Sequence, residues 1–225
     1  MRVLVVGSKG SMGRRYVAIL RYLKEEVLEA DLGDLWWEWA FDRVIIATPT
    51  DRHWVDLDAA ITRGKPILCE KPISKDPKAI QILADMAKHY GVDVRMCSNW
   101  KYAINLALTR AQKIAVEGEM EIEYKYFRSG GDGFFWDMIQ PIFLAGRLIY
   151  NNHRPAFKAS VNGIELNQGH FEESYVIMIS EWLYGDKSKL WSLEDALKAN
   201  QKVELAMGLA VSEVAGEINF GKVTI

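Results

Sequence analysis

Short apolar runs alternate with amphipathic segments along the first hundred positions of the chain. The apolar runs are continuous, as is typical of strands covered on both faces of a parallel sheet. They occupy residues 2–6, 43–48, 66–70 and 92–97. The amphipathic segments repeat apolar positions at helical spacing and occupy residues 11–24, 53–63 and 76–90. These strand–helix repeats predict an α/β fold with an N-terminal parallel sheet flanked by helices.

The pattern changes near residues 99–102, where we place a boundary between domains 1–100 and 101–225. Beyond it we expect a smaller α+β domain with a mostly antiparallel sheet of about four strands. Its expected strands are 121–127, 156–161, 164–166 and 219–225, its expected helices are 104–116, 171–184 and 192–214, and 129–133 is a glycine-rich turn.

Two local signals in the second domain are specific. Asn162-Gly163 stands between 156–161 and 164–166, in which apolar and polar residues alternate, and this pattern predicts a hairpin with a type I′ turn. Ser192 and Asp195 open the last helix in a capping-box pattern, in which each side chain can bind a free amide of the first turn.

Composition narrows the class of protein. The chain has 225 residues, 49% of them hydrophobic, and its 28 basic and 30 acidic side chains leave a net charge of −2. This balance gives no electrostatic reason to expect nucleic acid or a membrane surface as a partner. We expect no membrane span, no signal peptide and a cytoplasmic location. Cys69 and Cys97 lack the spacing of a disulfide framework or zinc site, so we expect buried thiols and no metal.

A glycine loop lies between the first strand and the first helix, where a phosphate cradle belongs. Glycine lets the backbone turn sharply and approach a pyrophosphate, and the helix N-terminus favours the anion. The first gap is one residue longer than in GxGxxG, and a tight turn without a ligand is the alternative. The candidate cofactor-binding residues here are Gly7, Ser8, Lys9, Gly10, Ser11, Met12 and Gly13.

The acidic residue expected about 20 positions further on, as a ligand of the adenosine ribose, is Asp31. It follows a weak strand pattern at 27–30, and Asp34 competes for the role. Either carboxylate can instead cap a short helix carrying Trp36, Trp37 and Trp39, which we expect to be core residues. No arginine after Asp31 is clearly placed to bind the 2′-phosphate of NADP, so the sequence leaves both NAD and NADP as candidate cofactors.

Three segments carry a family resemblance: GSMGRR at 10–15, VIIATPTDRH at 44–53 and GKPILCEKP at 64–72. Together they resemble the Gfo/Idh/MocA oxidoreductases, and the ATPxxxH and GKxxxxEKP patterns are more specific than the glycines. The resemblance is clear to about residue 102 and fainter beyond. It implies an N-terminal Rossmann domain that binds NAD(P), a C-terminal domain over the substrate site, and hydride transfer to or from a sugar, polyol or related small molecule.

The resemblance also implies site residues at the strand ends. Lys71 is the candidate catalytic group that hydrogen-bonds the reacting oxygen beside the nicotinamide, with a solvated loop lysine as the alternative. Glu70 and Pro72 fix its loop, Pro72 through a cis bond. The cofactor-binding candidates at these strand ends are Thr48, Pro49, Thr50, His53, Glu70, Lys71 and Pro72. For His53 we slightly favour a cap of the following helix.

In the second domain Asp137 matches the family's catalytic aspartate, which a histidine often follows four residues later on one helical face. Pro141 stands at that position and cannot transfer a proton. A bound water, Lys71, His153 or His170 are the alternative proton carriers, although both histidines lie in segments typical of the surface.

Asn99, Lys101 and Gln140 are the candidate substrate contacts, with polar surface roles as the alternative for Asn99 and Lys101. The stretch between Asp31 and Arg43 is too short for the helix–strand unit that usually precedes the strand at 43–48. We therefore expect the part of the domain that binds the adenosine half of the cofactor to be smaller than usual. The second domain is also short for the family. A homodimer that covers an exposed apolar sheet face is therefore expected.

The favoured function is an NAD(P)-dependent oxidoreductase acting on a sugar-like or carbonyl substrate. The alternative is a degenerate relative that binds a nucleotide or sugar in a regulatory or assembly role, which Pro141 favours and Lys71 disfavours. A nucleotide hydrolase is not supported, because GSKGSMG at 7–13 lacks a GK[ST] ending.

Overall fold

The computed structural model describes residues 1–108, 120–125, 133–145, 147–151, 158–210 and 215–220. The chain divides into two compact units, the first formed by residues 1–97 with 178–197 and the second by 98–177 with 198–225. The predicted fold class is confirmed: a parallel sheet in the first unit and a mostly antiparallel sheet in the second.

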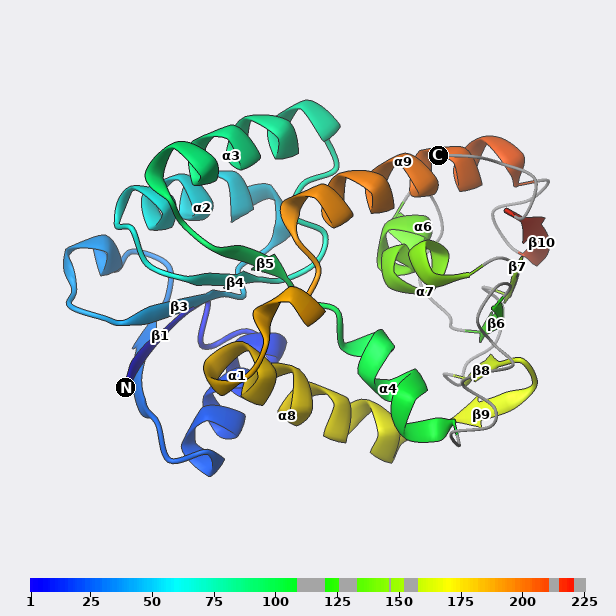
Figure 1. Ribbon diagram of the computed structural model, residues 1–225, viewed down its shortest axis with the longest axis horizontal. Helices are drawn as coiled ribbons and strands as arrows, with labels where there is room; N and C mark the ends of the chain where they lie inside the picture. Colours follow the sequence, from blue (N-terminus) through cyan, green and yellow to red (C-terminus); the bar gives the residue numbers. More distant parts are fainter. Residues whose placement is uncertain (109–119, 126–132, 146, 152–157, 211–214, 221–225) are drawn as a thin grey trace. The chain divides into compact units, whose positions relative to one another are not determined.

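The first unit is built on a five-stranded parallel sheet (Figure 1). Its strands lie in the order β2-β1-β3-β4-β5. Their bounds are β1 Arg2–Val6, β2 Glu26–Ala30, β3 Arg43–Ile46, β4 Ile67–Cys69 and β5 Val94–Met96. Leu4, Ile45 and Leu68 are fully buried in the central strands, as expected for strands covered on both faces.

Helices α2 and α3 cover one face of this sheet and α1 covers the other (Figure 1). Their bounds are α1 Ser11–Tyr22, α2 His53–Thr62 and α3 Pro77–Tyr90. Helix α3 begins where expected, because the Asp76 carboxylate accepts the Lys78 amide at 2.9 Å. It ends at Gly91, whose φ of +65° is the left-handed cap that glycine adopts readily.

The segment from 26 to 42 differs from the expectation in one respect. The sequence showed only a weak strand pattern at 27–30, yet β2 pairs with β1 along its full length, from Arg2 opposite Glu26 to Val6 opposite Ala30. Between β2 and β3 lies only the 3-10 turn η1, Trp36–Glu38. The expected loss of a helix–strand unit is therefore confirmed, while the strand that carries Asp31 at its end is retained.

Residues 178–197 pack with the first unit. The guanidinium of Arg43 donates to the Trp182 and Leu183 carbonyl oxygens at 2.9 and 3.2 Å. The Met96 amide of β5 donates to the Trp191 carbonyl at 2.8 Å, so this segment covers the edge strand. The division into domains 1–100 and 101–225 stays a prediction, and nothing in the local pattern at 178–197 indicates this return to the first sheet.

The second unit contains the sheet β10-β7-β6-β8-β9, parallel between β6 and β7 and antiparallel elsewhere. Its strands are β6 Glu121–Lys125, β7 Arg147–Asn151, β8 Lys158–Val161, β9 Ile164–Leu166 and β10 Ala215–Asn219. Its helices are α4 Asn99–Ala107, α6 Gly133–Asp137 and α7 Ile139–Leu144. Helices α8 Gln168–Tyr184 and α9 Leu193–Leu209 contribute residues to both units.

One expectation for this sheet was wrong. The described part of the sheet has five strands rather than about four, because the short run 147–151 forms β7 between β10 and β6. Strand β10, Ala215–Asn219, begins four residues before the expected strand 219–225, and its register buries Ile218 against the core and places Glu217 within an ion pair of Arg147. Parts of several expected elements lie outside the described residues, namely 109–116, 126–127, 129–132, 156–157, 211–214 and 221–225.

The two specific local signals are confirmed. Asn162 and Gly163 have φ of 48° and 76°, the left-handed pair that a type I′ turn requires, between β8 and β9. Ser192 Oγ accepts the Asp195 amide at 3.1 Å, and Asp195 Oδ2 accepts the Ser192 amide at 2.9 Å. This reciprocal pair is the capping box of α9.

The outer face of the second sheet is mostly polar among the described residues, with the half-buried Ile149 beside Glu123 and Glu217. The buried face carries Ile122, Leu148 and Ile218, whereas Arg147 on the other face bridges Glu121 and Glu217 across three strands. The homodimer stays a prediction, and the apolar face that led us to expect it is not found in the described part of this sheet.

Candidate functional site

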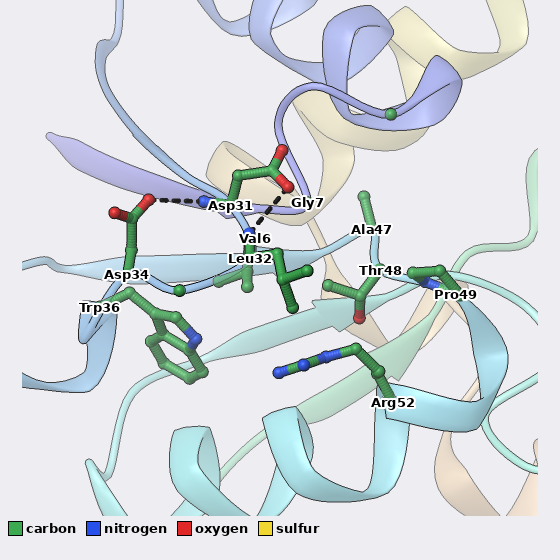
Figure 2. A pocket seen from close by; sticks show the side chains of 12 residues that line it. Val6, Gly7, Asp31, Leu32, Asp34, Trp36, Ala47, Thr48, Pro49 and Arg52 are labelled. Carbon is green, nitrogen blue, oxygen red and sulfur yellow. Dashed lines mark hydrogen bonds between the residues drawn. The ribbon is translucent and has the colours of Figure 1, made fainter.

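A cavity of about 300 Å³ opens at the carboxyl ends of β1, β2 and β3 (Figure 2). This is where the connections from β1 to its two neighbours diverge, the position at which open α/β sheets bind ligands. Gly7 and Gly10 line it from the loop after β1, Asp31 and Leu32 from the end of β2, and Thr48 from the end of β3.

The close approach of strands explains two of the three loop glycines. Gly7 has φ of +84°, and a Cβ there would lie 2.8 Å from the Ala47 backbone. A Cβ on Gly13 would lie 2.0 Å from the Gly7 carbonyl oxygen. Packing alone requires both residues, whether or not a ligand binds. Gly10 is less constrained, because a Cβ there would lie 3.2 Å from its nearest neighbour, the Gly7 carbonyl oxygen. It lines the cavity and, as the N-cap of α1, offers no side-chain oxygen to the first-turn amides.

The carboxylate of Asp31 connects β2 to the glycine loop. Asp31 Oδ1 accepts the Leu32 amide and Oδ2 accepts the Lys9 amide, both at 2.8 Å. These two hydrogen bonds lower the pKa of the Asp31 carboxyl, which is therefore ionised at neutral pH. Asp34 accepts the Asp31 amide at 2.8 Å and lies beside it at the cavity rim (Figure 2). One end of the cavity is thus acidic.

The other predicted cofactor-binding residues lie in the loop after β1, in the first turn of α1 and in the segment between β3 and α2. Ser8 is buried and its amide donates to the Ala30 carbonyl. Ser11 and Met12 form the first turn of α1. Pro49 lines the cavity, and Thr50 opens the 3-10 turn η2, Thr50–Arg52, directly before α2.

A buried carboxylate orders the end of β3. Asp56 of α2 is 1% exposed, and its Oδ2 accepts the Thr48 hydroxyl at 2.7 Å. Its Oδ1 lies 3.5 Å from a guanidinium nitrogen of Arg52. The strand end and the cavity wall are therefore fixed by one side chain of α2.

His53 does not cap a helix, which corrects the role we favoured. It is the first residue of α2 and is 1% exposed. Its Nδ1 lies 2.8 Å from the Pro72 carbonyl oxygen, and its Nε2 lies 2.8 Å from the Thr48 carbonyl oxygen. The ring thereby ties the loop after β3 to the loop after β4.

The loop after β4 is fixed by hydrogen bonds of the buried Glu70 side chain. The Lys71–Pro72 bond is cis, as expected. Glu70 is buried, accepts the Lys71 amide at 3.0 Å and accepts the hydroxyl of Tyr16. The same hydroxyl lies 3.1 Å from Cys97 Sγ. The half-buried Lys71 thus follows a residue, Glu70, whose carboxylate is fixed by Tyr16 of α1.

Both thiols are buried, as expected, and burial raises the pKa of Cys69 and of Cys97 well above that of an ordinary thiol. They are therefore protonated and unreactive. No group of metal-ligating side chains occurs among the described residues, and no helix in that part of the chain is long and apolar enough to cross a membrane.

In the second unit, two of the candidate substrate residues bind each other. The Gln140 amide donates to Asn99 Oδ1 at 3.1 Å, and Asn99 donates to Ser174 Oγ at 3.3 Å. Gln140 Oε1 accepts the Trp100 amide at 3.0 Å. Both side chains are 3% exposed, so their amides support α4 and α7. Their role in substrate binding stays a prediction.

Asp137 and Pro141 are not on one continuous helix. Asp137 ends α6, Met138 forms a turn, and Pro141 lies in the first turn of α7. Proline is tolerated there, because first-turn amides have no partner within the helix. Spacing four residues apart therefore does not define a proton-transfer pair in this chain.

Of the remaining candidates, Lys101 is half-buried in α4. His170 lies in the first turn of α8, where its Nδ1 accepts the Asn167 amide at 3.3 Å, a helix-start contact. His153 lies outside the described residues.

Sequence reasoning missed several residues of the first site, among them Arg52, Trp36 and Leu32, which line the cavity, and Asp56, which orders β3. Arg52 stands inside the ATPxxxH segment and Asp56 is an acidic residue on the buried face of α2. For Arg52 and Asp56, the signal in the sequence that could have identified them was a charged side chain at a position where one is unusual. Of the three tryptophans expected in the core, Trp36 is 2% exposed and confirms the expectation, although it also forms part of the cavity wall. Trp39 is half-buried, and the expectation was wrong for Trp37, which is 40% exposed.

Comparisons with known proteins agree with this geometry. The model of the GFO_IDH_MocA oxidoreductase family, NAD-binding Rossmann fold, matches residues 30–97. A search of curated proteins finds no match.

Solved structures extend the likeness over the chain. A WlbA (WbpB) dehydrogenase from Thermus thermophilus, crystallised with NAD and α-ketoglutarate, has a TM-score of 0.69 at 13% identity, covering 95% of this chain and 96% of that one. A myo-inositol dehydrogenase from Corynebacterium glutamicum has a TM-score of 0.72 at 12% identity, with 97% and 99% covered. A Gfo/Idh/MocA oxidoreductase from Vibrio cholerae has a TM-score of 0.68 at 14% identity, with 91% and 96% covered.

The resemblance to the Gfo/Idh/MocA oxidoreductases is therefore confirmed, by the family's model over residues 30–97 and by the fold over nearly the whole chain. The matched model is that of an NAD-binding family, and structural neighbours hold NAD, which agrees with the expected cofactor class.

Proposed function

We propose that this protein binds NAD(H) and catalyses hydride transfer to or from a sugar, polyol or related small carbonyl or hydroxyl compound. The observation that carries the proposal is the cavity at the ends of β1, β2 and β3, with the glycine loop on one side and an ionised aspartate on the other.

The residues present fit the adenosine half of NAD. Gly10 leaves the wall of the cavity free of side-chain atoms, and the α1 N-terminus favours the pyrophosphate. The Asp31 carboxylate accepts hydroxyl groups of the ribose. A second carboxylate, Asp34, lies beside Asp31 and repels a 2′-phosphate. The acidic end of the cavity thus favours NAD over NADP.

When bound, NAD supplies the group that accepts or donates the hydride. The chain's own contribution is to hold and protonate the substrate oxygen. Lys71 donates a hydrogen bond to that oxygen and a proton to it during reduction. Glu70 and His53 are positioning residues, because Glu70 binds the Lys71 amide and His53 ties the loop that carries Lys71 to the loop after β3. Asp137 assists by accepting a substrate hydrogen bond.

The substrate class follows from the relatives, which include a myo-inositol dehydrogenase and a dehydrogenase crystallised with UDP-GlcNAcA. Both ligands named there are polyhydroxylated. A polyol or a sugar nucleotide is therefore the first substrate class to screen.

The test is a titration of the purified protein with NADH, following nicotinamide fluorescence and quenching of the eight tryptophans. Saturable binding is expected, with NADPH weaker. A screen of polyols, sugars, sugar nucleotides and 2-oxo acids then measures turnover. Lys71→Ala should lower turnover by at least about 100-fold and change the NADH Kd by less than about threefold, because the lysine acts on the substrate.

Lys78→Ala is the matched control, since Lys78 is an exposed lysine in the first turn of α3. It should behave as wild type. Absence of NADH binding at millimolar concentration would contradict the proposal. Binding without turnover of any screened compound would instead indicate the nucleotide-binding, non-catalytic alternative.

A further inference from the structure

The adenosine end of the cavity contains a cation to which the proposed function assigns no role. Arg52 ends η2, and its guanidinium extends across the cavity toward the indole of Trp36, below Leu32 (Figure 2). The Arg52 side chain is 42% exposed, so a bound molecule can reach it.

Arg52 is oriented by the element that follows it. Its NH2 group lies 3.5 Å from Asp56 Oδ1, one helical turn away, and the Asp56 side chain is only 2% exposed. Asp56 is itself fixed by the Thr48 hydroxyl. The 3.5 Å contact with Asp56 restricts the orientation of the Arg52 side chain, and this carboxylate does not cover the planar faces of the guanidinium.

The wall around Arg52 selects the kind of group that fits. Leu32, Trp36 and Pro49 make this part of the cavity apolar. In Figure 2 the carboxylates Asp31 and Asp34 lie on the opposite side of Leu32 from Arg52, with Asp34 next to Trp36. A molecule that matches this wall has a flat aromatic part against the apolar residues and hydroxyl groups that reach the carboxylates, which describes adenosine.

We infer that Arg52 stacks its guanidinium on the adenine base and determines the affinity of the cavity for the adenosine half of the cofactor. A guanidinium stacks favourably on aromatic faces. A 2′-phosphate ligand role is disfavoured, because the site that would receive the phosphate is bordered by the ionised Asp31, with the acidic side chain of Asp34 beside it. The inference rests on the proposed function for the identity of the dinucleotide, and on the cavity alone for the adenine nucleotide.

The experiment compares wild type, Arg52→Ala, Arg52→Lys and Arg21→Ala in titrations with NADH, NADPH, ADP-ribose and reduced nicotinamide mononucleotide. Arg52→Ala should raise the Kd for NADH and for ADP-ribose by about 5- to 30-fold. Arg52→Lys should restore only part of the affinity, because lysine keeps the charge and lacks the plane. Binding of the mononucleotide should not change.

Arg21→Ala is the matched control, since Arg21 is an exposed arginine of α1 paired with Glu29 on the surface. It should bind every ligand as wild type does, and circular dichroism should be the same for all variants. Equal ADP-ribose binding by wild type and Arg52→Ala would overturn the inference. A loss confined to NADPH would also overturn it, because Arg52 would then be a phosphate ligand.

The two proposals fail separately. Wild type that binds ADP-ribose but not NADH contradicts the proposed function, while Arg52→Ala still decides the inference through ADP-ribose. Wild type that binds NADH, with no effect of Arg52→Ala on any ligand, contradicts the inference alone. Wild type that binds neither overturns both.

Discussion

Lys202 is the residue whose environment differs most from what its place in the sequence suggests. It lies in α9, and its ammonium donates to the Phe143 and Ala145 carbonyl oxygens at 3.1 and 2.6 Å. It also stands 4.5 Å from the centre of the Phe220 ring. Burial lowers the pKa of Lys202 from 10.5 to about 8. A lysine on a helix face normally lies in solvent, and only the packing of α7 and residue 220 around it removes that solvent.

This lowered pKa predicts a pH dependence of stability. The folded state binds fewer protons than the unfolded state between about pH 8 and 10.5, so the contribution of Lys202 to the free energy of unfolding rises with pH through that window. Below about pH 8 its charge costs stability and the cost is constant. Urea denaturation of wild type and Lys202→Met at pH 7, 8, 9 and 10 should show the difference between them shifting in favour of wild type. A constant difference would contradict the prediction.

At the scale of single elements, local signals were sufficient where the partners lie within a few residues. The Asn162-Gly163 turn and the α9 capping box were both predicted, because their hydrogen bonds and dihedral angles involve neighbouring residues. Strand β7 and the start of β10 were not predicted, since each depends on a partner strand far away in the chain.

The capping box gives a prediction for α9. Ser192→Ala and Asp195→Ala should each lower the free energy of unfolding by about 1 kcal/mol. The double variant should lose less than the sum, because each side chain caps the amide of the other residue. The measurement is urea denaturation followed by tryptophan fluorescence. Glu204→Ala, an exposed change in the middle of α9, is the control, and strictly additive losses would contradict a reciprocal box.

At the scale of the whole molecule, the first unit is assembled from two separate parts of the sequence. Trp182 and Leu190 are almost completely buried, and Arg43 and Met96 each bind a carbonyl of the returning segment 178–197. A boundary near residue 100, drawn from the pattern alone, therefore omits part of the packing of the parallel sheet.

A fragment of residues 1–100 should consequently fail to fold cooperatively. Removing 178–197 leaves the guanidinium of Arg43 and the amide of Met96 without these partners and exposes apolar surface of the core. The fragment should bind a hydrophobic dye and give a poorly dispersed amide spectrum, whereas the intact chain should give a dispersed one. A cooperative urea transition of the fragment would show that 178–197 is dispensable.

The sequence by itself determined the parallel sheet, the glycine loop, Asp31 at the end of the second strand and the Lys71-Pro72 loop, because periodicity and short motifs encode local geometry and strand ends converge in this topology. Only the tertiary structure decided that Gly7 and Gly13 serve packing, that His53 bridges two loops, that Asn99 and Gln140 bind each other, and that Arg52 enters the cavity. Each of these depends on atoms brought together from distant positions, which no local pattern records.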